Sequence, residues 1–326
     1  MSELEQIKGI GPKVAEKLVE AGITDLAELA VRRPEEIKEI LKITLKKAKD
    51  ICNQAQQIAL DKAIKLHTLQ DIIEHKKKIT KRISTGSLAL DNLLKGGIPT
   101  EAITVLFGEY ASGKTQLCKQ LAVNCIKQYG RKVAWIETES GTFSPDRILE
   151  IAKANNIEID LEKDFIIIPA SYISTPFNQF LAYKLIEKEC VEKGYDLGLL
   201  VIDSFTAKFR SFYTGREQLP DRAKETARHF GFLDRIASKF NCAVVLTCQA
   251  TDVPDAQLQL KQLAKTGTRK EIVGGNIVKH SGTYLLALQK VKKDEWECIV
   301  FDAPDIPMQS VRFRILSSGI KDIVTR

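Results

Sequence analysis

Residues 103–116 read Ile-Thr-Val-Leu-Phe-Gly-Glu-Tyr-Ala-Ser-Gly-Lys-Thr-Gln, and this stretch decides the fold. Within it, residues 108–115 have the G-x-x-x-x-G-K-[ST] spacing of a phosphate-binding loop. The apolar, β-branched run 103–107 leads into the loop and predicts a strand. The residues that follow at helical spacing are Leu117, Leu121, Ala122 and Cys125. The sequence therefore predicts the strand–loop–helix order that this motif needs.

The loop predicts a site for a nucleoside triphosphate. Gly108 and Gly113 let backbone N–H groups wrap around a phosphate at a helix N-terminus, whose dipole favours an anion. Lys114 is expected to reach the β- and γ-phosphates, and the Thr115 hydroxyl to hold Mg²⁺. ATP and Mg²⁺ are therefore the predicted cofactors. The other residues expected at the nucleotide are Glu109, Tyr110, Ala111, Ser112 and Gln116.

Polar residues close three of the strands predicted after the loop. The apolar run 199–202 ends in Asp203, which is expected to orient Mg²⁺, although an Asp can also end a strand for structural reasons. Another strand ends in Glu137-Thr138-Glu139. Glu139 is the predicted group that polarises the attacking water, with Glu137 in reserve and two solvated acids as the alternative. A third strand ends in Gln249, a candidate hydrogen-bond partner of the γ-phosphate.

Length and composition limit the class of protein. The chain of 326 residues is long enough for about two domains, and 44% hydrophobic and 28% charged residues are usual for a globular protein. Without an apolar run of about 18 residues or a signal-peptide pattern, a cytoplasmic protein with no membrane partner is expected. The seven cysteines form no C-x-x-C pair and predict buried, reduced thiols. A net charge of +7 suggests a polyanionic partner without deciding it.

Three segments are predicted along the chain. Residues 1–63 read as a small all-α domain, in which a glycine turn at 7–13 sets Pro12 at the start of a helix. The turn has the spacing of a helix-hairpin-helix module, whose backbone amides hold a nucleic-acid phosphate; a purely structural turn is the alternative. Residues 64–83 lose helical periodicity and end in a basic run, as expected for a linker with solvated charge.

Residues 84–326 predict an α/β fold, because apolar strands alternate with amphipathic helices. Continuous apolar runs such as 199–202 suit strands covered on both faces, and hence a mostly parallel central sheet. The last three strands follow one another closely and are expected to form antiparallel hairpins at one edge. The predicted strands are 103–107, 132–137, 165–170, 197–203, 242–249, 285–291, 297–302 and 310–316.

Two polar segments are candidates for binding single-stranded nucleic acid. The first, 210–216, is expected to be a loop with two arginines and two aromatic residues. The second, 250–271, is long, polar and rich in basic residues. Surface loops with incidental charge are the alternative interpretation of both. The candidate DNA-binding residues are Arg210, Tyr213, Arg216, Arg222, Lys261, Lys265, Arg269, Lys270 and Gly275.

Taken in this order, the motifs resemble the archaeal RadA recombinases and their eukaryotic counterparts in the RecA superfamily, over nearly the whole chain. The stretches that carry the resemblance are 82–87 (RISTGS), 107–116, 142–147 (TFSPDR), 201–204 (VIDS), 213–216 (YTGR) and 274–276 (GGN). The resemblance implies a RecA-like P-loop ATPase core joined to a helix-hairpin-helix domain. It also implies a DNA-dependent ATPase that polymerises on single-stranded DNA, pairs it with homologous duplex and exchanges strands.

By motif match, the resemblance also implies roles for individual residues. Lys114, Thr115 and Asp203 would hold Mg-ATP, and Glu139 would activate water. Arg147 would lie along the adenine, Gln249 would sense the γ-phosphate, and Asp302 would cap the ATP of a neighbouring subunit. Arg216 and the loop 250–273 would face DNA. The implied partners are single- and double-stranded DNA and further copies of the chain, as a filament or ring, at the nucleoid.

The chain departs from the family pattern in its linker. Where the family has Phe-x-x-Ala, residues 66–69 read Leu-His-Thr-Leu, so Leu66 and Leu69 are the candidate oligomerisation residues. The second DNA loop is longer than usual and has no aromatic residue. The other departures are Ala111 in place of a loop glycine, an extra Ser140 after the catalytic Glu, and Leu285 and Gln289 in place of arginines.

Three functions are compatible with these features. The leading one is an ATP-dependent DNA strand-exchange recombinase. The altered linker and missing arginines favour instead an accessory protein that binds DNA or the recombinase with little or no strand exchange. A hexameric helicase or small-molecule kinase on the same core would have little use for the N-terminal module.

Overall fold

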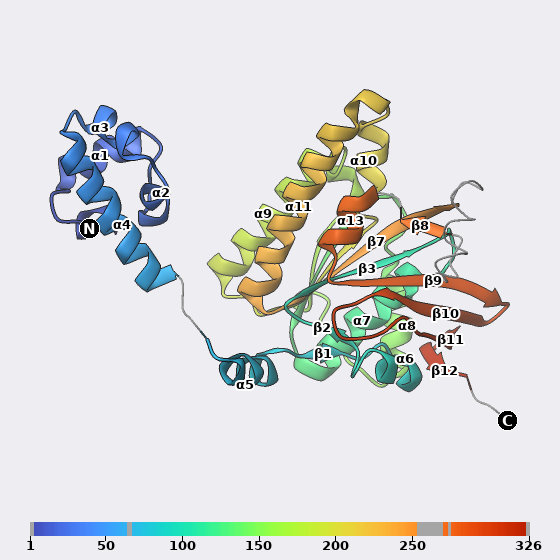
Figure 1. Cartoon of the computed structure of the whole chain (residues 1–326). Helices are drawn as coiled ribbons and strands as arrows, with labels where there is room; N and C mark the ends of the chain where they lie inside the picture. The colour runs from blue at the N-terminus through green and yellow to red at the C-terminus, as the bar shows by residue number, and fades with distance from the viewer. Residues whose placement is uncertain (1–2, 64–66, 253–269, 273–274, 324–326) are drawn as a thin grey trace. The chain divides into compact units, whose positions relative to one another are not determined.

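The computed structural model describes residues 3–63, 67–252, 270–272 and 275–323 (Figure 1). The chain divides into two compact units, Met1–Lys78 and Ile79–Arg326, and each is described by itself. The division falls inside the segment 64–83 that was predicted to be a linker. Within the described ranges, no helix has both the length and the apolar character needed to span a membrane.

The N-terminal unit is helical, as predicted. Its elements are η1 (Glu3–Gln6), α1 (Pro12–Glu20), α2 (Leu26–Ala30), α3 (Pro34–Leu41) and α4 (Leu45–Ala63). They enclose a small apolar core that includes Leu4, Leu18 and Leu29. In the turn before α1, Ile7 and Ile10 are buried, whereas Gly9 is exposed with φ +103°, a conformation that favours glycine. The turn therefore presents its backbone outward while its isoleucines anchor it.

A further helix, α5 (Leu69–Ile79), occupies the segment predicted to lack helical structure, so that prediction was wrong. A reciprocal cap starts the helix: Thr68 N–H donates to Asp71 Oδ2 at 2.8 Å, and Asp71 N–H donates to the Thr68 hydroxyl at 3.2 Å. Such a cap satisfies two amides that a helix start leaves open. The basic residues 76–78 lie in the last turn, where they suit the helix dipole. Both signals were present in the sequence.

The C-terminal unit is built on a large sheet with the strand order β12-β11-β10-β9-β3-β7-β6-β4-β5. Strands β9, β3, β7, β6, β4 and β5 are parallel to their neighbours in that order, which confirms the predicted mostly parallel sheet. The strands are β3 (Ala102–Gly108), β4 (Lys132–Glu137), β5 (Phe165–Ile168), β6 (Leu197–Asp203), β7 (Ala243–Asp252), β9 (Tyr284–Lys292), β10 (Glu295–Asp302), β11 (Ser310–Leu316) and β12 (Gly319–Asp322).

Helices cover both faces of this sheet (Figure 1). Along β3, Ile103, Val105 and Phe107 belong to one core and Leu106 to the other, because side chains alternate along a strand. One face packs against α9 (Pro176–Lys193), α11 (Leu219–Phe240) and α13 (Gly275–Ser281), and the other against α6 (Leu88–Leu93) and α7 (Lys114–Tyr129). The remaining helical elements are α8 (Pro145–Ala154), α10 (Ala207–Phe212), η2 (Ala170–Tyr172) and η3 (Arg216–Gln218).

One edge of the sheet consists of antiparallel strands, as predicted for the last three. Strands β9, β10 and β11 form successive antiparallel pairs, and β12, which was not predicted, extends them. Two short strands, β1 (Arg82–Ile83) and β2 (Ile98–Pro99), pair separately, and β8 (Lys270–Ile272) pairs with β7. All seven cysteines are buried free thiols, which confirms that prediction.

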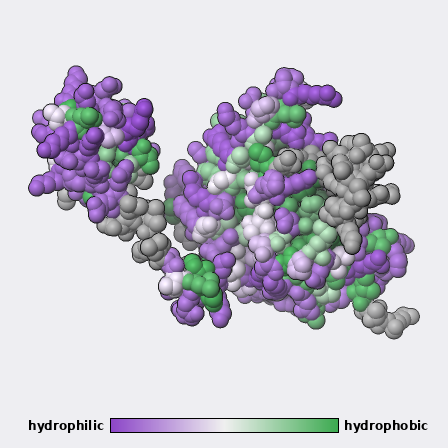
Figure 2. Space-filling model, in the orientation of Figure 1, coloured by the Kyte–Doolittle hydropathy of each residue, from purple (hydrophilic) through white to green (hydrophobic). Residues whose placement is uncertain are grey.

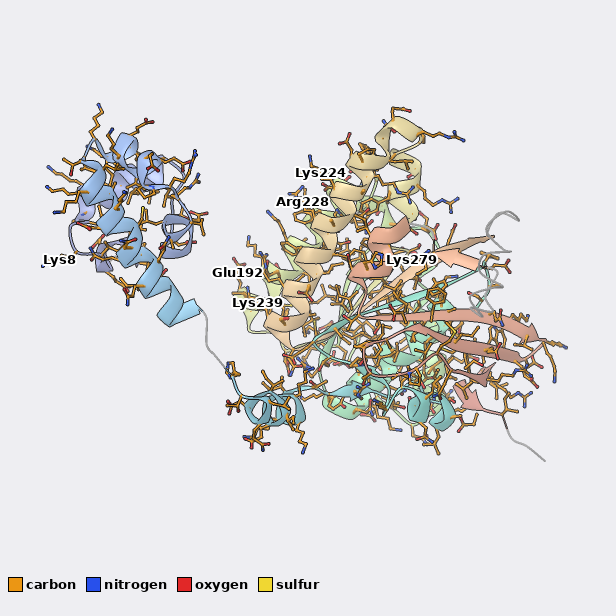
Figure 3. The ribbon with its side chains drawn as sticks, in the orientation of Figure 1. Lys8, Glu192, Lys224, Arg228, Lys239 and Lys279 are labelled. Atoms are coloured by element: carbon orange, nitrogen blue, oxygen red, sulfur yellow. The ribbon has the colours of Figure 1, made fainter. Side chains whose placement is uncertain are left out.

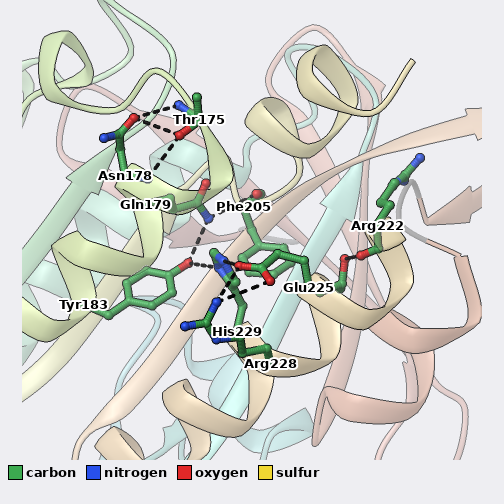
Figure 4. A network of polar contacts seen from close by, with 10 residues as sticks. Thr175, Asn178, Gln179, Tyr183, Phe205, Arg222, Glu225, Arg228 and His229 are labelled. Carbon is green, nitrogen blue, oxygen red and sulfur yellow. Dashed lines mark hydrogen bonds and ion pairs between the residues drawn. The ribbon is translucent and has the colours of Figure 1, made fainter. Parts of the chain in front are cut away.

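A buried polar network joins two covering helices to the end of β6 (Figure 4). Gln179 on α9 donates to the Tyr183 hydroxyl at 2.8 Å and to the Phe205 carbonyl oxygen at 3.2 Å. His229 on α11 lies with Nδ1 3.2 Å from the same hydroxyl. Burial lowers the pKa of His229 to about 3, so the imidazole is neutral at physiological pH. The network therefore holds α9 and α11 to the segment that directly follows Asp203.

Candidate functional site

The predicted phosphate-binding loop connects the carboxyl end of β3 to the N-terminus of α7. Gly113 has φ +92°, and a Cβ atom there would lie 2.8 Å from Cδ1 of Ile315, so only glycine fits. Ala111 also adopts a left-handed conformation, with φ +59°. Alanine pays roughly 1–2 kcal/mol for this conformation, which the usual glycine would avoid. The loop thus keeps its shape despite the substitution.

A cavity of about 430 Å³ opens over this loop and brings most of the predicted nucleotide residues together. The lining includes Lys114 and Thr115 from α7, Glu139 just after β4, Asp203 at the end of β6 and Gln249 on β7. The other predicted residues in the lining are Tyr110, Ala111, Ser112, Gly113 and Gln116. Residues far apart in the sequence therefore share one site.

The side chain of Lys114 folds back over the loop. Its Nζ donates to the carbonyl oxygens of Gly108 at 2.9 Å and Glu109 at 2.6 Å, and to the Ser112 hydroxyl at 3.1 Å. Burial lowers the pKa of Lys114 from its ordinary value, and the charge of Asp203 opposes that shift. An incoming phosphate would replace neutral acceptors with a full negative charge.

The carboxylate of Asp203 is held by two threonines. The Thr115 hydroxyl donates to Oδ2 at 2.8 Å, and the Thr247 hydroxyl donates to Oδ1 at 2.5 Å. These oxygens suit Mg²⁺, which usually takes one or two protein ligands together with phosphate oxygens and water. Across the described ranges, no cluster of three or more His, Cys, Asp or Glu residues could hold a metal by itself.

The two candidate carboxylates after β4 have different surroundings. Glu137 is buried: its Oε1 accepts from the amides of Thr142 at 2.9 Å and Phe143 at 3.0 Å, and its Oε2 from that of Ala170 at 3.3 Å. Both carboxylate oxygens of Glu137 are therefore bound to backbone amides. Glu139 instead lines the cavity. The geometry thus separates a structural acid from one that can face a ligand.

Lys119 was missed in the sequence analysis. It lies one turn after Thr115 on α7, is 3% exposed and lines the same cavity. Its Nζ donates to the Thr142 carbonyl oxygen at 3.2 Å, which ties α7 to the loop that carries Glu139. Burial lowers the pKa of Lys119, and the charge of Asp203 opposes the shift. Its i+4 spacing from Thr115 was the available signal.

The first basic segment adjoins the cavity. Arg210 lies in helix α10 and Arg216 begins the 3₁₀ helix η3, so the prediction of a loop over 210–216 was wrong for residues 210–212 and for 216. The short helix forms because Phe209 is buried under it. The Arg210 guanidinium donates to Oε1 of Gln249, which lines the cavity. A direct contact therefore links this segment to the nucleotide site.

Positive charge gathers around Arg210. Burial lowers the pKa of Arg222, and the nearby charge of Arg210 lowers it further. Arg216 is exposed, and Tyr213 is half-buried with its ring 5.0 Å from that of Phe212. Further along α11, Lys224 and Arg228 project outward (Figure 3). A bound anion such as a phosphate would reduce the repulsion between the guanidiniums of Arg210 and Arg222.

The second basic segment is partly outside the described residues, which include none of Lys261, Lys265 and Arg269. Its two ends are strands rather than loop, contrary to the predicted start at residue 250. Ala250 on β7 pairs antiparallel with Ile272 on β8, which begins at Lys270. Gly275 is the first residue of α13. The segment therefore leaves and re-enters the core beside Gln249.

Arg147 and Asp302 lie outside the cavity lining. The Arg147 guanidinium donates to Gln116 Oε1 at 2.9 Å, to the Ser317 carbonyl oxygen at 2.6 Å and to that of Leu316. It therefore ties the start of α7 to the end of β11. Asp302 ends β10 and is exposed.

Leu285 and Gln289, which stand where the family has arginines, both lie on β9 but in different surroundings. Leu285 is buried in the sheet core, so it is no surface residue. Gln289 is exposed and donates to Glu297 Oε2 at 2.7 Å.

The N-terminal unit carries a separate basic hollow. A cavity of about 410 Å³ lies beside the glycine turn, lined by Lys8, Gly9, Lys17 and Lys47 among others. Lys8 projects from the turn (Figure 3). The N-cap residue of helix α1 is Gly11, so the first amides of the helix have no side-chain acceptor at the cap. This is the arrangement expected of a turn that can bind a phosphate.

An apolar groove of about 440 Å³ lies between β5 and α9. Exposed apolar side chains line it, among them Ile167, Leu181 and Leu185. Leu69, one of the two predicted oligomerisation residues, is 77% exposed at the start of α5, and Figure 2 shows apolar surface gathered on this helix. Leu66 is outside the described residues.

Comparison with known proteins gives matches over both units. Residues 75–323 match the family model described as Rad51, and residues 1–57 match that of a SAM-like helix-hairpin-helix tandem. The chain is 34% identical over 331 residues to the DNA repair and recombination protein RadA of Cenarchaeum symbiosum, covering 98% of this chain and 79% of that protein. It is 32% identical over 335 residues to the protein of the same name from Methanococcus maripaludis strain C6, covering 98% and 99%.

Proposed function

The chain belongs to the Rad51 family, and from this membership we propose that it is an ATP-dependent DNA strand-exchange recombinase. It polymerises on single-stranded DNA and promotes homologous pairing in recombination and repair. The contact between Arg210 and Gln249 carries the proposal, because it joins the basic segment to the phosphate-binding cavity. A recombinase whose hold on DNA depends on ATP needs such a coupling.

The residues around the cavity fit ATP and Mg²⁺. Lys114 and the amides of the loop bind the phosphates, while Thr115 and Asp203 offer oxygens to the metal. Mg²⁺, when bound, supplies positive charge to the β- and γ-phosphates. Glu139 polarises the attacking water, and Gln249 senses the γ-phosphate. Gly108, Glu109, Tyr110, Ala111, Ser112, Gly113 and Gln116 complete the nucleotide pocket, Arg147 lies along the adenine, and Asp302 caps the nucleotide of a neighbouring copy.

DNA binds along the basic segments beside the cavity. Arg210, Arg216 and Arg222 provide the charge, and Tyr213 with Phe212 provides aromatic surface for unpaired bases. Lys261, Lys265, Arg269, Lys270 and Gly275 complete the DNA-binding set, which takes single-stranded and then double-stranded DNA. This activity places the protein in the cytoplasm, at the nucleoid.

The N-terminal residues 1–63 act as a helix-hairpin-helix domain that grips the DNA backbone without reading its sequence. The uncapped start of α1 and the lysines around Gly9 support this role. Residues 64–83 act as the oligomerisation linker, and residues 84–326 as the ATPase core. The three segments thus divide DNA capture, assembly and ATP turnover.

Self-association uses the linker of one copy and the groove of another. Leu66 and Leu69 are apolar residues spaced to enter one groove, and the hollow lined by Leu181 and Leu185 is apolar and open. Leu66 is smaller than the aromatic anchor that it replaces, so this pocket contact is weaker than in the family pattern. Filaments or rings of this protein therefore depend more on ATP held between copies.

An accessory protein is the alternative function, and the exposed Gln289 favours it, because an arginine at that surface position would supply a charge for DNA. The test is the ATPase rate with and without single-stranded DNA, together with electron microscopy of the same samples. DNA-stimulated turnover with filaments supports the recombinase. ATP binding without stimulation or filaments supports the accessory protein.

A further inference from the structure

Trp296 is an aromatic side chain of the nucleotide cavity that no motif pointed to. It lies on β10 and lines the cavity together with the phosphate-binding loop. Its indole Nε1 donates to the Ala111 carbonyl oxygen at 3.4 Å. A Cβ atom on Gly113 would lie 3.3 Å from Cδ1 of the same ring. The indole therefore rests against the turn of the loop where phosphates bind.

The surroundings of Trp296 hold the ring in place. Lys290 on the neighbouring strand lies with Nζ 5.3 Å from the ring centroid, a cation–π contact that fixes the indole from one side. Ile315 on β11 packs against Gly113 from the same edge of the loop. Arg147 ties the end of β11 to α7 through the carbonyl oxygens of Leu316 and Ser317 and through Gln116. Trp296 and Ile315 thus form a braced apolar rim.

The chemistry of this rim suits the base of a nucleotide. With the triphosphate at Gly113 and Lys114, the ribose and base must emerge from the loop at its edge. On the side of the loop, Trp296 contacts Ala111, Gly113 and Ile315, none of which has a polar side-chain atom to read the edge of a base. An aromatic ring beside an aliphatic side chain instead stabilises a flat base in proportion to the surface that the two bury together.

We propose that the indole of Trp296 is the platform on which the nucleotide base stacks. This rests on the proposed ATP-binding function and adds a specificity-determining residue to the same site. The platform selects by stacking area, so purine nucleotides bind more tightly than pyrimidine nucleotides. Triphosphate alone gains nothing from it.

Calorimetric titration of ATP, CTP and inorganic tripolyphosphate into wild type, Trp296→Ala and Trp296→Phe tests the proposal. Trp296→Ala should weaken ATP by about fivefold to a hundredfold, as expected for the loss of one stacked base. It should leave tripolyphosphate affinity unchanged and narrow the preference for ATP over CTP. Trp296→Phe keeps an aromatic plane and should retain most of the ATP affinity.

Fluorescence gives an independent reading, because the only other tryptophan, Trp135, is fully buried. ATP should quench the wild-type signal but not that of Trp296→Phe, and tripolyphosphate should quench neither. If Trp296→Ala lost ATP and tripolyphosphate binding equally, or lost neither, the stacking role of Trp296 would be overturned while the proposed ATP-binding function would stand. Wild-type protein that binds neither ligand overturns the proposed function itself.

Discussion

The hydroxyl of Thr115 lies 2.8 Å from Oδ2 of Asp203, although 88 residues separate them in the chain. Thr115 lies in the first turn of α7 and Asp203 ends β6, so the contact exists only because β3, β7 and β6 are neighbours in the sheet. The pair turns a phosphate-binding loop into a place where a metal can be held against the phosphates.

Replacing Lys114 by Ala should reduce ATP turnover by about a hundredfold or more, because the transferred phosphate loses a positioned cation. Steady-state ATPase assays with saturating single-stranded DNA measure the effect. Lys127→Ala is the matched control, since Lys127 lies on the same helix and is exposed. Normal turnover in Lys114→Ala would remove this lysine from the site.

Glu139→Gln should affect the rate of ATP hydrolysis, whereas Glu137→Gln should affect the stability of the fold. Glu139→Gln should slow hydrolysis by about a hundredfold to ten-thousandfold while ATP still binds, because the water loses its base. Glu137→Gln should instead lower the free energy of unfolding by about 1–3 kcal/mol, since it removes the charge that three backbone amides share. Single-turnover kinetics and thermal melts separate the two. Slower hydrolysis with unchanged stability in Glu137→Gln would reverse the assignment.

Arg216→Ala should weaken binding of single-stranded DNA and reduce the slope of log affinity against log salt by about 1, since one phosphate contact is lost. Fluorescence anisotropy with a labelled oligonucleotide at several salt concentrations gives the slope. Lys163→Ala, an exposed lysine paired with Asp160 away from these segments, is the control. A slope equal to that of wild type would leave Arg216 without a phosphate contact.

Charged replacements in the linker should shrink the oligomers. Leu66→Asp with Leu69→Asp, and separately Leu185→Asp in the groove, should each lower the mass seen by light scattering, because a carboxylate cannot enter an apolar groove unpaired. Val191→Asp changes an exposed residue of the same helix outside the groove and should have no effect. Oligomers of unaltered size in all variants would exclude this docking.

Stability should fall below pH 6.5 on account of His229. Its pKa is about 3 in the folded chain, so between pH 6.5 and 3 the unfolded state takes up a proton that the folded state refuses. The loss reaches about 2 kcal/mol at pH 5 and grows until about pH 3. The groups that face the imidazole are Glu225, 3.5 Å from Nε2, Arg228 and the Tyr183 hydroxyl.

Denaturant unfolding from pH 7 to pH 4 tests this linkage. His229→Phe, which suits the surrounding aromatic rings, should unfold with a shallower dependence on pH than wild type. His280→Gln changes an exposed histidine and should keep the wild-type dependence. If the stability of His229→Phe and of wild type depended equally on pH, the lowered pKa of His229 would be contradicted.

Local features explain what could be predicted from the sequence. The loop at 108–115, the apolar strands and the antiparallel edge all follow from spacing between near neighbours in the chain. The glycine turn before α1 is of the same kind. Helix α5 was missed although its cap, Thr68 with Asp71, lies within four residues, so that error was one of interpretation.

Long-range features could not be predicted in the same way. Glu137 and Glu139 are both acidic residues at one strand end, and only the fold gives Glu137 to backbone amides and leaves Glu139 at the cavity. Trp296 reaches the phosphate-binding loop from a strand 185 residues away from Ala111. Arg210 meets Gln249 across 39 residues.

The sequence by itself determined that this chain has a phosphate-binding loop on a parallel sheet with a helical module before it, because those elements depend on residues a few positions apart. Only the tertiary structure decided which side chains meet at that loop. Strand order and register set those meetings, and neither is written in the spacing of neighbouring residues.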